Sequence, residues 1–358
     1  MAFDENDNVD GENTENMVVE TVYVPKKPYT PAKDYSRMGF GFLAFWLMWQ
    51  ILILIIGALY LFLSGAERLD LSTAILLSCA GEGLSFPVYL LITKKISYER
   101  LSYDRLSFGR LFIYIGVVFF LGIAGNIIGI VINSVISSNG GTASVSNITD
   151  YIEHDFALML CYAVFAGPVI EEFLCRKILI DRLYRYGKST VMVASGIIFA
   201  LLHGNLEQFF YTFFVGCFFA YIYIKTGRIR YSIILHMIMN GFSLILTYVL
   251  SKIPALSASE DASTMVKNIM SDDTQAVMIL VLIAMVLFEY GMAIAGLIYC
   301  IVRFREFSFG SEDSSDSAPV GKCFINPGMT ILIVVLFLDM MLTVMDTSFA
   351  ELLIGVFH

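Results

Sequence analysis

The chain has 358 residues, of which 57% are hydrophobic and 15% are charged, with a formal net charge of -9. Soluble domains carry about 25% charged residues, so this composition and a mean hydropathy of +0.73 exclude an ordinary soluble globular protein. Several apolar runs reach about 20 residues, the length at which a helix crosses a bilayer. The sequence therefore predicts an all-α protein, a polytopic transmembrane helical bundle with eight or nine membrane segments.

Much of the negative charge is concentrated in the first 20 residues, which are polar and lack the basic start and apolar stretch of a signal peptide. Such a composition does not bury enough apolar surface to fold. We therefore expect a disordered acidic cytoplasmic tail over 1–38 and a transmembrane helical domain over 39–358. Nothing in the composition indicates a nucleic-acid partner.

The apolar segments follow one another along the chain with polar connections between them. The expected ranges are 39–64, 71–93, 111–136, 155–175 with a helical continuation to about 184, 189–204, 206–224, 231–250, 275–302 and 329–349. The ninth is the weakest, because Asp339 and Asp346 interrupt it. A Gly125-x-x-x-Gly129 motif in the third segment predicts close packing of two helix backbones.

Basic residues are unevenly divided between the two sets of alternate connections. Of the 23 Lys and Arg residues, 20 lie on the side of the N-terminal flank, and the other side has Arg68, Lys252 and Lys267. Lys and Arg accumulate in the cytoplasmic loops of membrane proteins. The distribution therefore predicts an integral membrane protein with a cytoplasmic N-terminus.

Ionisable and polar side chains gather in the fourth, fifth and seventh segments, where each is costly in lipid. Glu172 and Arg176 are four residues apart, so they share a helix face and can form an ion pair. Glu171 then points about 100° away from that pair and stays free for other work. His203 ends the fifth segment. The seventh segment carries one more pair at helical spacing, His236 and Asn240.

This set of side chains is suited to hydrolysis. A carboxylate in an apolar setting can take a proton from water, and a histidine can orient the same water. A second histidine and an amide could donate hydrogen bonds to the oxyanion of a tetrahedral intermediate. Alternatively, Glu171, His203 and His236 could bind a divalent metal such as zinc, with water at the open position. Both the metal-dependent and the metal-free mechanism remain open.

Three motifs in this region resemble the signatures of the CAAX protease and bacteriocin-processing family, also called CPBP or Abi. They are E-E-x-x-x-R at 171–176, F-x-x-x-H at 199–203 and H-x-x-x-N at 236–240. Further similarity lies in G-C-F-F-A-Y at 216–221 and T-G at 226–227, although Ala220 replaces a usual Gly and Arg228 a common Ser. The resemblance covers about 155–245.

The resemblance implies a membrane endopeptidase of the CAAX type, in a prokaryotic cell membrane and surrounded by membrane lipids. Its substrate would be a peptide or protein, with or without a lipid, and nothing in the sequence indicates a prenylated one. By resemblance, Glu171 is the general base and His203 assists it, while His236 and Asn240 form the oxyanion site. Glu172 and Arg176 would support the first of these helices.

This chemistry requires three helices to bring their polar side chains to one depth. His203 and His236 lie roughly 22 Å and 10 Å from the cytoplasmic starts of their segments. Glu171 can meet them only if the fourth segment continues as a helix beyond Arg176. We therefore predict one long or kinked helix over 155–184.

Two other classes of function compete with hydrolysis. In an ion-coupled transporter, Glu82, Glu289 and Asp339 would form an ion path with Glu171. The chain shows no pair of broken helices in matching halves, which disfavours this reading. A non-catalytic membrane scaffold or bacteriocin-immunity protein would keep the fold without turnover.

Overall fold

The structure is a computed structural model that describes residues 30–138, 152, 155–256, 261–307 and 318–344. The unit Pro31–His358 is distinct from Met1–Thr30 and is the one described below. The described residues form helices and turns with no strand, which confirms the all-α fold. The acidic tail up to residue 29, most of the outer loop 138–154, the stretch 308–317 and the chain after 344 lie outside the described residues.

Eight described helices are long and apolar enough to cross a membrane, and a ninth apolar helix is shorter. The eight are α1 (Pro31–Ser64), α2 (Leu71–Thr93), α3 (Phe108–Ser138), the fourth helix (Phe156–Tyr186), α9 (Leu206–Thr226), α10 (Ile229–Ser251), α12 (Asp273–Val302) and α14 (Pro327–Val344). The shorter one is α8 (Lys188–Leu202). Small elements between them are η4 (Pro254–Leu256), α11 (Ala262–Ser271), η5 (Phe304–Phe307) and α13 (Val320–Phe324). The predicted count of eight or nine segments is confirmed.

The shortest segment and the start of the first helix differ from those expected. The weak membrane segment is the fifth, which forms the 15-residue α8, rather than the ninth. Helix α1 begins at Pro31, so residues 31–38 are helical and do not belong to a tail. Tertiary contacts hold this extension, because Tyr35 is fully buried and Asp34 forms a 2.6 Å ion pair with Arg185.

The fourth helix is continuous over Phe156–Tyr186, which confirms the single long helix predicted for 155–184. Along it lie α5 (Phe156–Met159), η1 (Leu160–Ala166), α6 (Gly167–Glu172), η2 (Phe173–Ile178), α7 (Leu179–Leu183) and η3 (Tyr184–Tyr186). Both η1 and η2 are π-helical and flank α6, which carries the two carboxylates. Such wide turns are rare and are frequent at functional sites.

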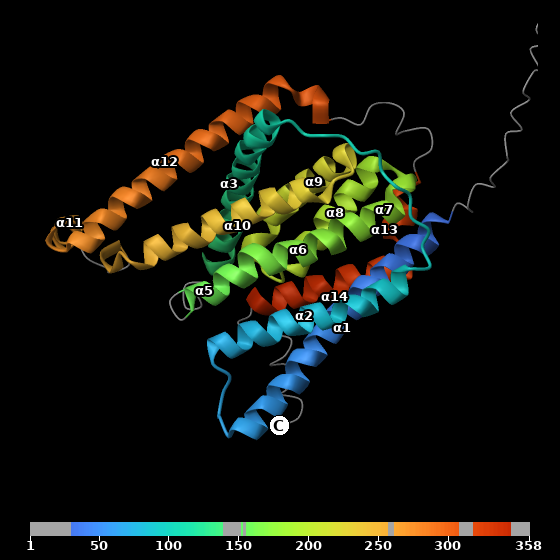
Figure 1. Cartoon of the computed structure of the whole chain (residues 1–358), viewed down its shortest axis with the longest axis horizontal. Coiled ribbons are helices and arrows are strands. Elements are labelled where there is room, and N and C mark those ends of the chain that lie inside the picture. The colour runs from blue at the N-terminus through green and yellow to red at the C-terminus, as the bar shows by residue number, and fades with distance from the viewer. Residues whose placement is uncertain (1–29, 139–151, 153–154, 257–260, 308–317, 345–358) are drawn as a thin grey trace, which may run out of the picture. The chain divides into compact units, whose positions relative to one another are not determined.

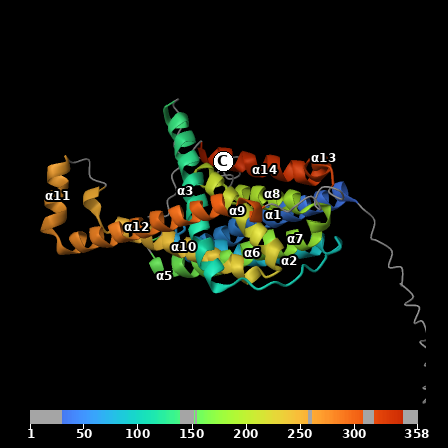
Figure 2. The ribbon, with the colours of Figure 1, turned by 90° about the horizontal axis from the view of Figure 1, so that it is seen from above.

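The fourth helix, α8, α9 and α10 lie together in the middle of this unit (Figures 1 and 2). Helices α1, α2 and α14 pack on one side of this group, and α3 and α12 pack on the other. A Cβ atom added at Gly125 of α3 would collide with the Tyr211 backbone, and one added at Gly129 would lie 2.8 Å from the backbone carbonyl oxygen of Glu207. The close backbone packing predicted from the Gly125-x-x-x-Gly129 motif is therefore confirmed, with α9 as the partner.

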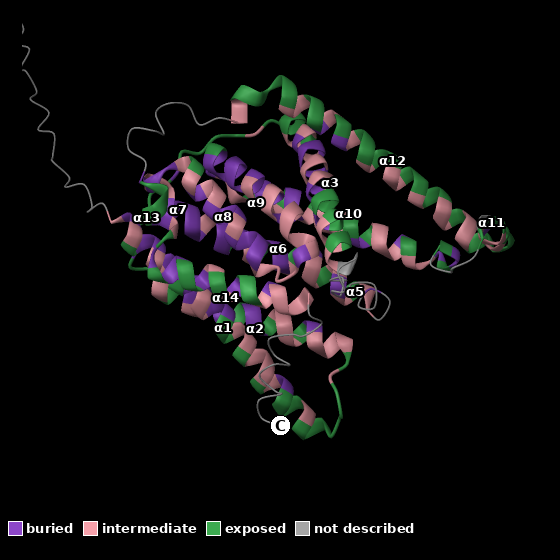
Figure 3. Ribbon diagram, turned by 180° about the vertical axis from the view of Figure 1, so that it is seen from behind, coloured by how far each residue is buried: buried purple, intermediate pink, exposed green. Residues whose placement is uncertain are grey.

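Residues in the centre of the unit are mostly buried, and residues at its margins are mostly exposed (Figure 3). Among the spans, α9 has the largest buried share and α12 the smallest. The apolar side chains of Leu280, Leu287 and Ile294 on α12 are more than half exposed. In a membrane such a surface faces lipid, so the shielded centre is where polar groups can be sheltered from it.

Candidate active site

The ion pair predicted on the fourth helix is present and completely enclosed. Arg176 Nε lies 3.2 Å from Glu172 Oε2, and neither side chain is exposed. The guanidinium carbon of Arg176 also lies 4.4 Å from the centre of the Phe199 ring and 5.6 Å from that of Phe219. These ring faces attract the cation and partly replace its lost hydration.

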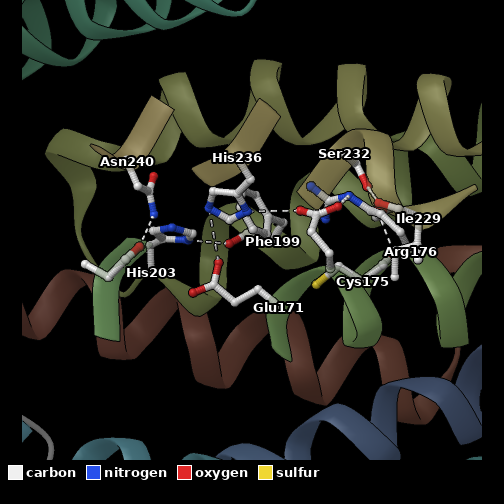
Figure 4. A network of polar contacts seen from close by, with 12 residues as sticks. Glu171, Cys175, Arg176, Phe199, His203, Ile229, Ser232, His236 and Asn240 are labelled. Carbon is white, nitrogen blue, oxygen red and sulfur yellow. Dashed lines mark hydrogen bonds and ion pairs between the residues drawn. The ribbon is translucent and has the colours of Figure 1, made fainter. Parts of the chain in front are cut away.

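His236 of α10 contacts both adjacent carboxylates of the fourth helix, Glu171 and Glu172; Figure 4 shows its ring beside Glu171. Its Nδ1 is 3.2 Å from Glu172 Oε1, and its Nε2 is 3.7 Å from Glu171 Oε2. The ring packs against Phe199 and Phe219 at centroid distances of 5.6 Å and 5.5 Å. Glu172 therefore contacts both Arg176 and His236, and the imidazole joins this buried cluster to Glu171.

His203 comes from the end of α8, and its orientation is fixed by its own helix. Its Nδ1 lies 2.7 Å from the carbonyl oxygen of Phe199, one helical turn earlier. A carbonyl only accepts hydrogen bonds, so Nδ1 carries the proton in this contact and Nε2 remains available. The F-x-x-x-H motif thus has two structural roles: the Phe199 backbone orients His203, and the Phe199 ring covers Arg176.

Asn240 ties α10 to the first π turn of the fourth helix. Its Nδ2 donates to the carbonyl oxygen of Ala163 at 2.8 Å. In this turn the Gly167 N–H bonds to Tyr162, one residue further back than in an α-helix. Pro168 is the residue whose N–H would reach Ala163 in the same pattern, and proline has none. Asn240 therefore satisfies a carbonyl that Pro168 leaves open.

A cavity of about 540 Å³ opens beside these groups. Glu171, His203 and Asn240 all contribute to its wall, whereas Glu172, Arg176 and His236 do not. The Glu171 side chain is 30% exposed and that of Glu172 is not exposed. The structure thus brings all six predicted side chains into one continuous cluster, in which three face the cavity and three lie behind it.

Several side chains of the cavity wall were not singled out from the sequence as parts of a site. Phe45 and Trp49 come from α1, and Tyr162, Gln208 and Tyr211 come from helices of the motif region. No spacing pattern distinguishes these aromatic and amide side chains from ordinary packing residues. Glu82 of α2 also lines the cavity. The sequence feature that drew attention to Glu82 was a charged residue within an apolar segment.

The other acids considered for an ion path do not reach this cavity. Glu289 of α12 and Asp339 of α14 are absent from its wall. Asp339 instead lies near the turn after α8, where a Cβ atom at Gly204 would be 3.2 Å from its Oδ2. The described residues therefore do not join Glu82, Glu289 and Asp339 into one polar path.

The candidate metal ligands Glu171, His203 and His236 do not form a ligand set as they lie. Within the described part of the chain, no group of three or more His, Cys, Asp or Glu side chains is placed to hold a metal ion. A histidine that bonds a carbonyl or carboxylate through Nδ1 keeps Nε2 for other partners, so the contacts of His203 and His236 do not by themselves exclude a metal. Both the metal-dependent and the metal-free mechanism stay predictions.

The helical bundle, with a buried cluster of Glu, His, Arg and Asn beside a cavity, places this chain among the membrane proteins that enclose a polar site between their membrane-spanning helices. Residues 153–242 match the family described as type II CAAX prenyl endopeptidase Rce1-like. This match confirms the resemblance read from the motifs, because the matched residues contain all three of them.

Two curated relatives share part of this region. The membrane-embedded CAAX protease MroQ of Staphylococcus aureus (strain USA300) is 30% identical over 125 residues, which are 32% of this chain and 51% of MroQ. YdiL, a proposed membrane peptidase of Bacillus subtilis (strain 168), is 34% identical over 92 residues, which are 25% of this chain and 37% of YdiL. The chain thus spans about half or less of the length of these relatives. No solved structure matches.

Proposed function

We propose that this protein is an integral-membrane endopeptidase that hydrolyses a peptide bond within or near the bilayer. The observation that carries the proposal is the different setting of two adjacent carboxylates. Glu172 is enclosed with Arg176 and His236, whereas Glu171 borders the cavity together with His203 and Asn240. One carboxylate is thus held as part of the scaffold, and its neighbour is left to react.

In this proposal Glu171 removes a proton from a water molecule in the cavity as the water oxygen attacks the substrate carbonyl carbon. His203 accepts a hydrogen bond from the same water through Nε2, because its Nδ1 is occupied by Phe199. The C–N bond of the tetrahedral intermediate then breaks, and Glu171 passes its proton to the departing amine. Atoms and charge balance without a further reactant.

Asn240 and His236 are the proposed donors to the oxyanion of that intermediate. The Asn240 amide has two N–H bonds, and one of them is used on Ala163. The second is available to the cavity that Asn240 lines. His236 lies behind the cavity wall, so in this proposal its Nε2 reaches the oxyanion beside Glu171. Because Nδ1 donates to Glu172, this second donation requires the doubly protonated ring.

The cavity wall also bears on the class of substrate. Phe45, Trp49, Leu174, Met239 and Leu244 provide an apolar surface next to the reactive groups. Such a surface suits an apolar peptide segment that enters from the membrane or its interface, with or without a lipid attached. We further propose that the N-terminus is cytoplasmic, on the basis of the Lys and Arg distribution.

The test is peptide cleavage by purified protein in lipid nanodiscs. The substrates are a peptide library in which each cysteine peptide is present with and without a prenyl group, and products are identified by mass spectrometry. Glu171→Gln and His203→Ala should each lower turnover by about 10²-fold or more, while Glu289→Gln, an equivalent change outside the cavity, should not.

The alternatives predict different results in the same experiment. A scaffold or immunity protein would give no product with any peptide while remaining folded. A transporter would give ion-coupled flux in liposomes and no cleavage. Cleavage that persists unchanged in Glu171→Gln would overturn the assignment of the general base.

A further inference from the structure

Glu82 is a buried carboxyl group that the proposed hydrolysis does not use. It lies on α2, outside the matched residues 153–242, and is 3% exposed. Nevertheless, its side chain contributes to the wall of the cavity that holds Glu171. The hydroxyl of Tyr162 donates to its Oε2 at 3.4 Å. A second acid therefore borders the reaction space, oriented by a tyrosine of the fourth helix.

The charges around the cavity are not balanced. Glu172 is compensated by Arg176 and His236. Glu82 takes part in none of the ion pairs among the described residues. The cavity wall holds two carboxyl groups and neither Lys nor Arg, and the imidazole of His203 is its one basic side chain. A carboxylate shielded from water is costly unless it is protonated or a cation accompanies it. No Lys or Arg of the cavity wall can supply that cation to Glu82, whereas a cationic ligand in the cavity could.

We propose that Glu82 is a specificity residue that binds a cationic group of the substrate, such as a Lys or Arg side chain or a terminal amine. This inference rests on the proposed protease function and names its substrate class: apolar peptides with a basic group close to the scissile bond. The apolar stem of Lys or Arg would pack along the Phe45 and Trp49 side of the wall, with its charged end at Glu82.

A purely structural role for Glu82 makes a different prediction. Gln has the same shape and keeps an oxygen that can accept the hydrogen bond of Tyr162, so Glu82→Gln removes the charge while preserving the packing. If Glu82 serves only to bind Tyr162, this variant should treat charged and neutral peptides as the wild type does. If Glu82 binds a cation, only the charged peptides should be affected.

The experiment uses pairs of fluorescent dodecapeptides of Ala and Leu with a single Arg at stepped positions. In the partner peptide, citrulline, a neutral analogue of the same shape, replaces Arg. Binding is measured by fluorescence anisotropy in nanodiscs, and cleavage by mass spectrometry. A charge-assisted hydrogen bond contributes about 1.5–3 kcal/mol, so the wild type should prefer the Arg peptide by roughly 10- to 100-fold at its best position.

Glu82→Gln should bring this ratio close to one and leave citrulline peptides unaffected. Glu289→Gln should keep the wild-type ratio, since Glu289 does not line the cavity. Glu82→Asp retains the charge and should retain a preference, which covers the case in which Glu82→Gln does not fold. Equal treatment of Arg and citrulline by the wild type, or an equal loss for both in Glu82→Gln, overturns the inference.

The two proposals can fail separately. Preferential binding of Arg peptides without cleavage would refute the protease and leave the cation site standing. Cleavage without any preference for Arg peptides would support the protease and refute the cation site at Glu82.

Discussion

The buried ion pair of Glu172 and Arg176 allows a quantitative prediction for Arg176→Met. Neither side chain is exposed, and the remaining partner of Glu172 would be His236 at 3.2 Å. Removing one member of a buried pair costs about 3–5 kcal/mol, because the other charge is left without compensation. Met fills much of the same volume, and His236 offsets part of the charge. We therefore expect a loss of about 3 kcal/mol in unfolding free energy.

The double variant Glu172→Gln/Arg176→Met separates charge from packing. Replacing both members of a buried pair by groups of similar size is often nearly neutral, so the double variant should regain at least about 2 kcal/mol relative to Arg176→Met. The matched control is Lys177→Met, which breaks the neighbouring pair with Asp181 at the same spacing on the same helix. Lys177 is 36% exposed and Asp181 is 6% exposed, but Asp181 keeps the 2.7 Å hydrogen bond from the Tyr223 hydroxyl. This change should therefore cost less than Arg176→Met.

The assay is equilibrium unfolding by steric trapping in lipid bicelles, with circular dichroism to check the folded state. The reasoning is refuted if Arg176→Met costs no more than Lys177→Met, or if the double variant is less stable than Arg176→Met alone. Either result would mean that water or a neighbouring group already compensates Glu172.

Three further predictions follow from individual contacts. Gly328→Ala should destabilise the crossing of α1 and α14, because its Cβ would collide with the Ser36 carbonyl, whereas Gly83→Ala has open space; thermal unfolding compares them. Asn240→Ala should lower stability by about 1–3 kcal/mol, because the Ala163 carbonyl loses its partner, and should also slow cleavage. Since no described side chains form a metal-binding group, a chelator should leave cleavage unchanged, and metal analysis of the same sample should find less than one equivalent.

The parts of the site that could be predicted from the sequence are those that depend on one helix at a time. The spacing of Glu172 and Arg176 places them on one face wherever the helix lies, and the pair is present. The long fourth helix followed from a depth argument, because Glu171 could not otherwise reach His203 and His236. Both predictions use the geometry of a regular helix, which the chain fixes locally.

The parts that could not be predicted depend on how helices are placed against one another. No pattern in α1 shows that Phe45 and Trp49 border the same cavity as Glu171, and Glu82 of α2 was grouped with Glu171 only in the transporter alternative. The start of α1 was placed too late for the same reason, since contacts made by Asp34 and Tyr35 elsewhere in the bundle extend the helix. Hydropathy measures affinity for lipid and does not report such contacts.

The π turns show how local sequence and tertiary contact act together at this site. Pro168 removes an N–H within the fourth helix, and the side chain of Asn240 from α10 supplies the missing donor to Ala163. Asn240 is therefore placed by the same irregularity that shapes the helix around Glu171. Its role in the fold and its proposed role toward the oxyanion arise from one position.

The arrangement also explains why two adjacent carboxylates can have different tasks. Consecutive side chains on a helix point about 100° apart, so one turn can direct Glu172 into a compensated cluster and Glu171 toward the cavity. His236 bonds to the first and borders the second. Turning the fourth helix by one residue would bring either Glu172 to the cavity or Glu171 into the cluster, and Arg176 would move with them because it lies on the same helix. The contacts of the buried pair with His236 of α10 and with the rings of Phe199 and Phe219 therefore fix the rotation of the helix and, through it, the direction of Glu171.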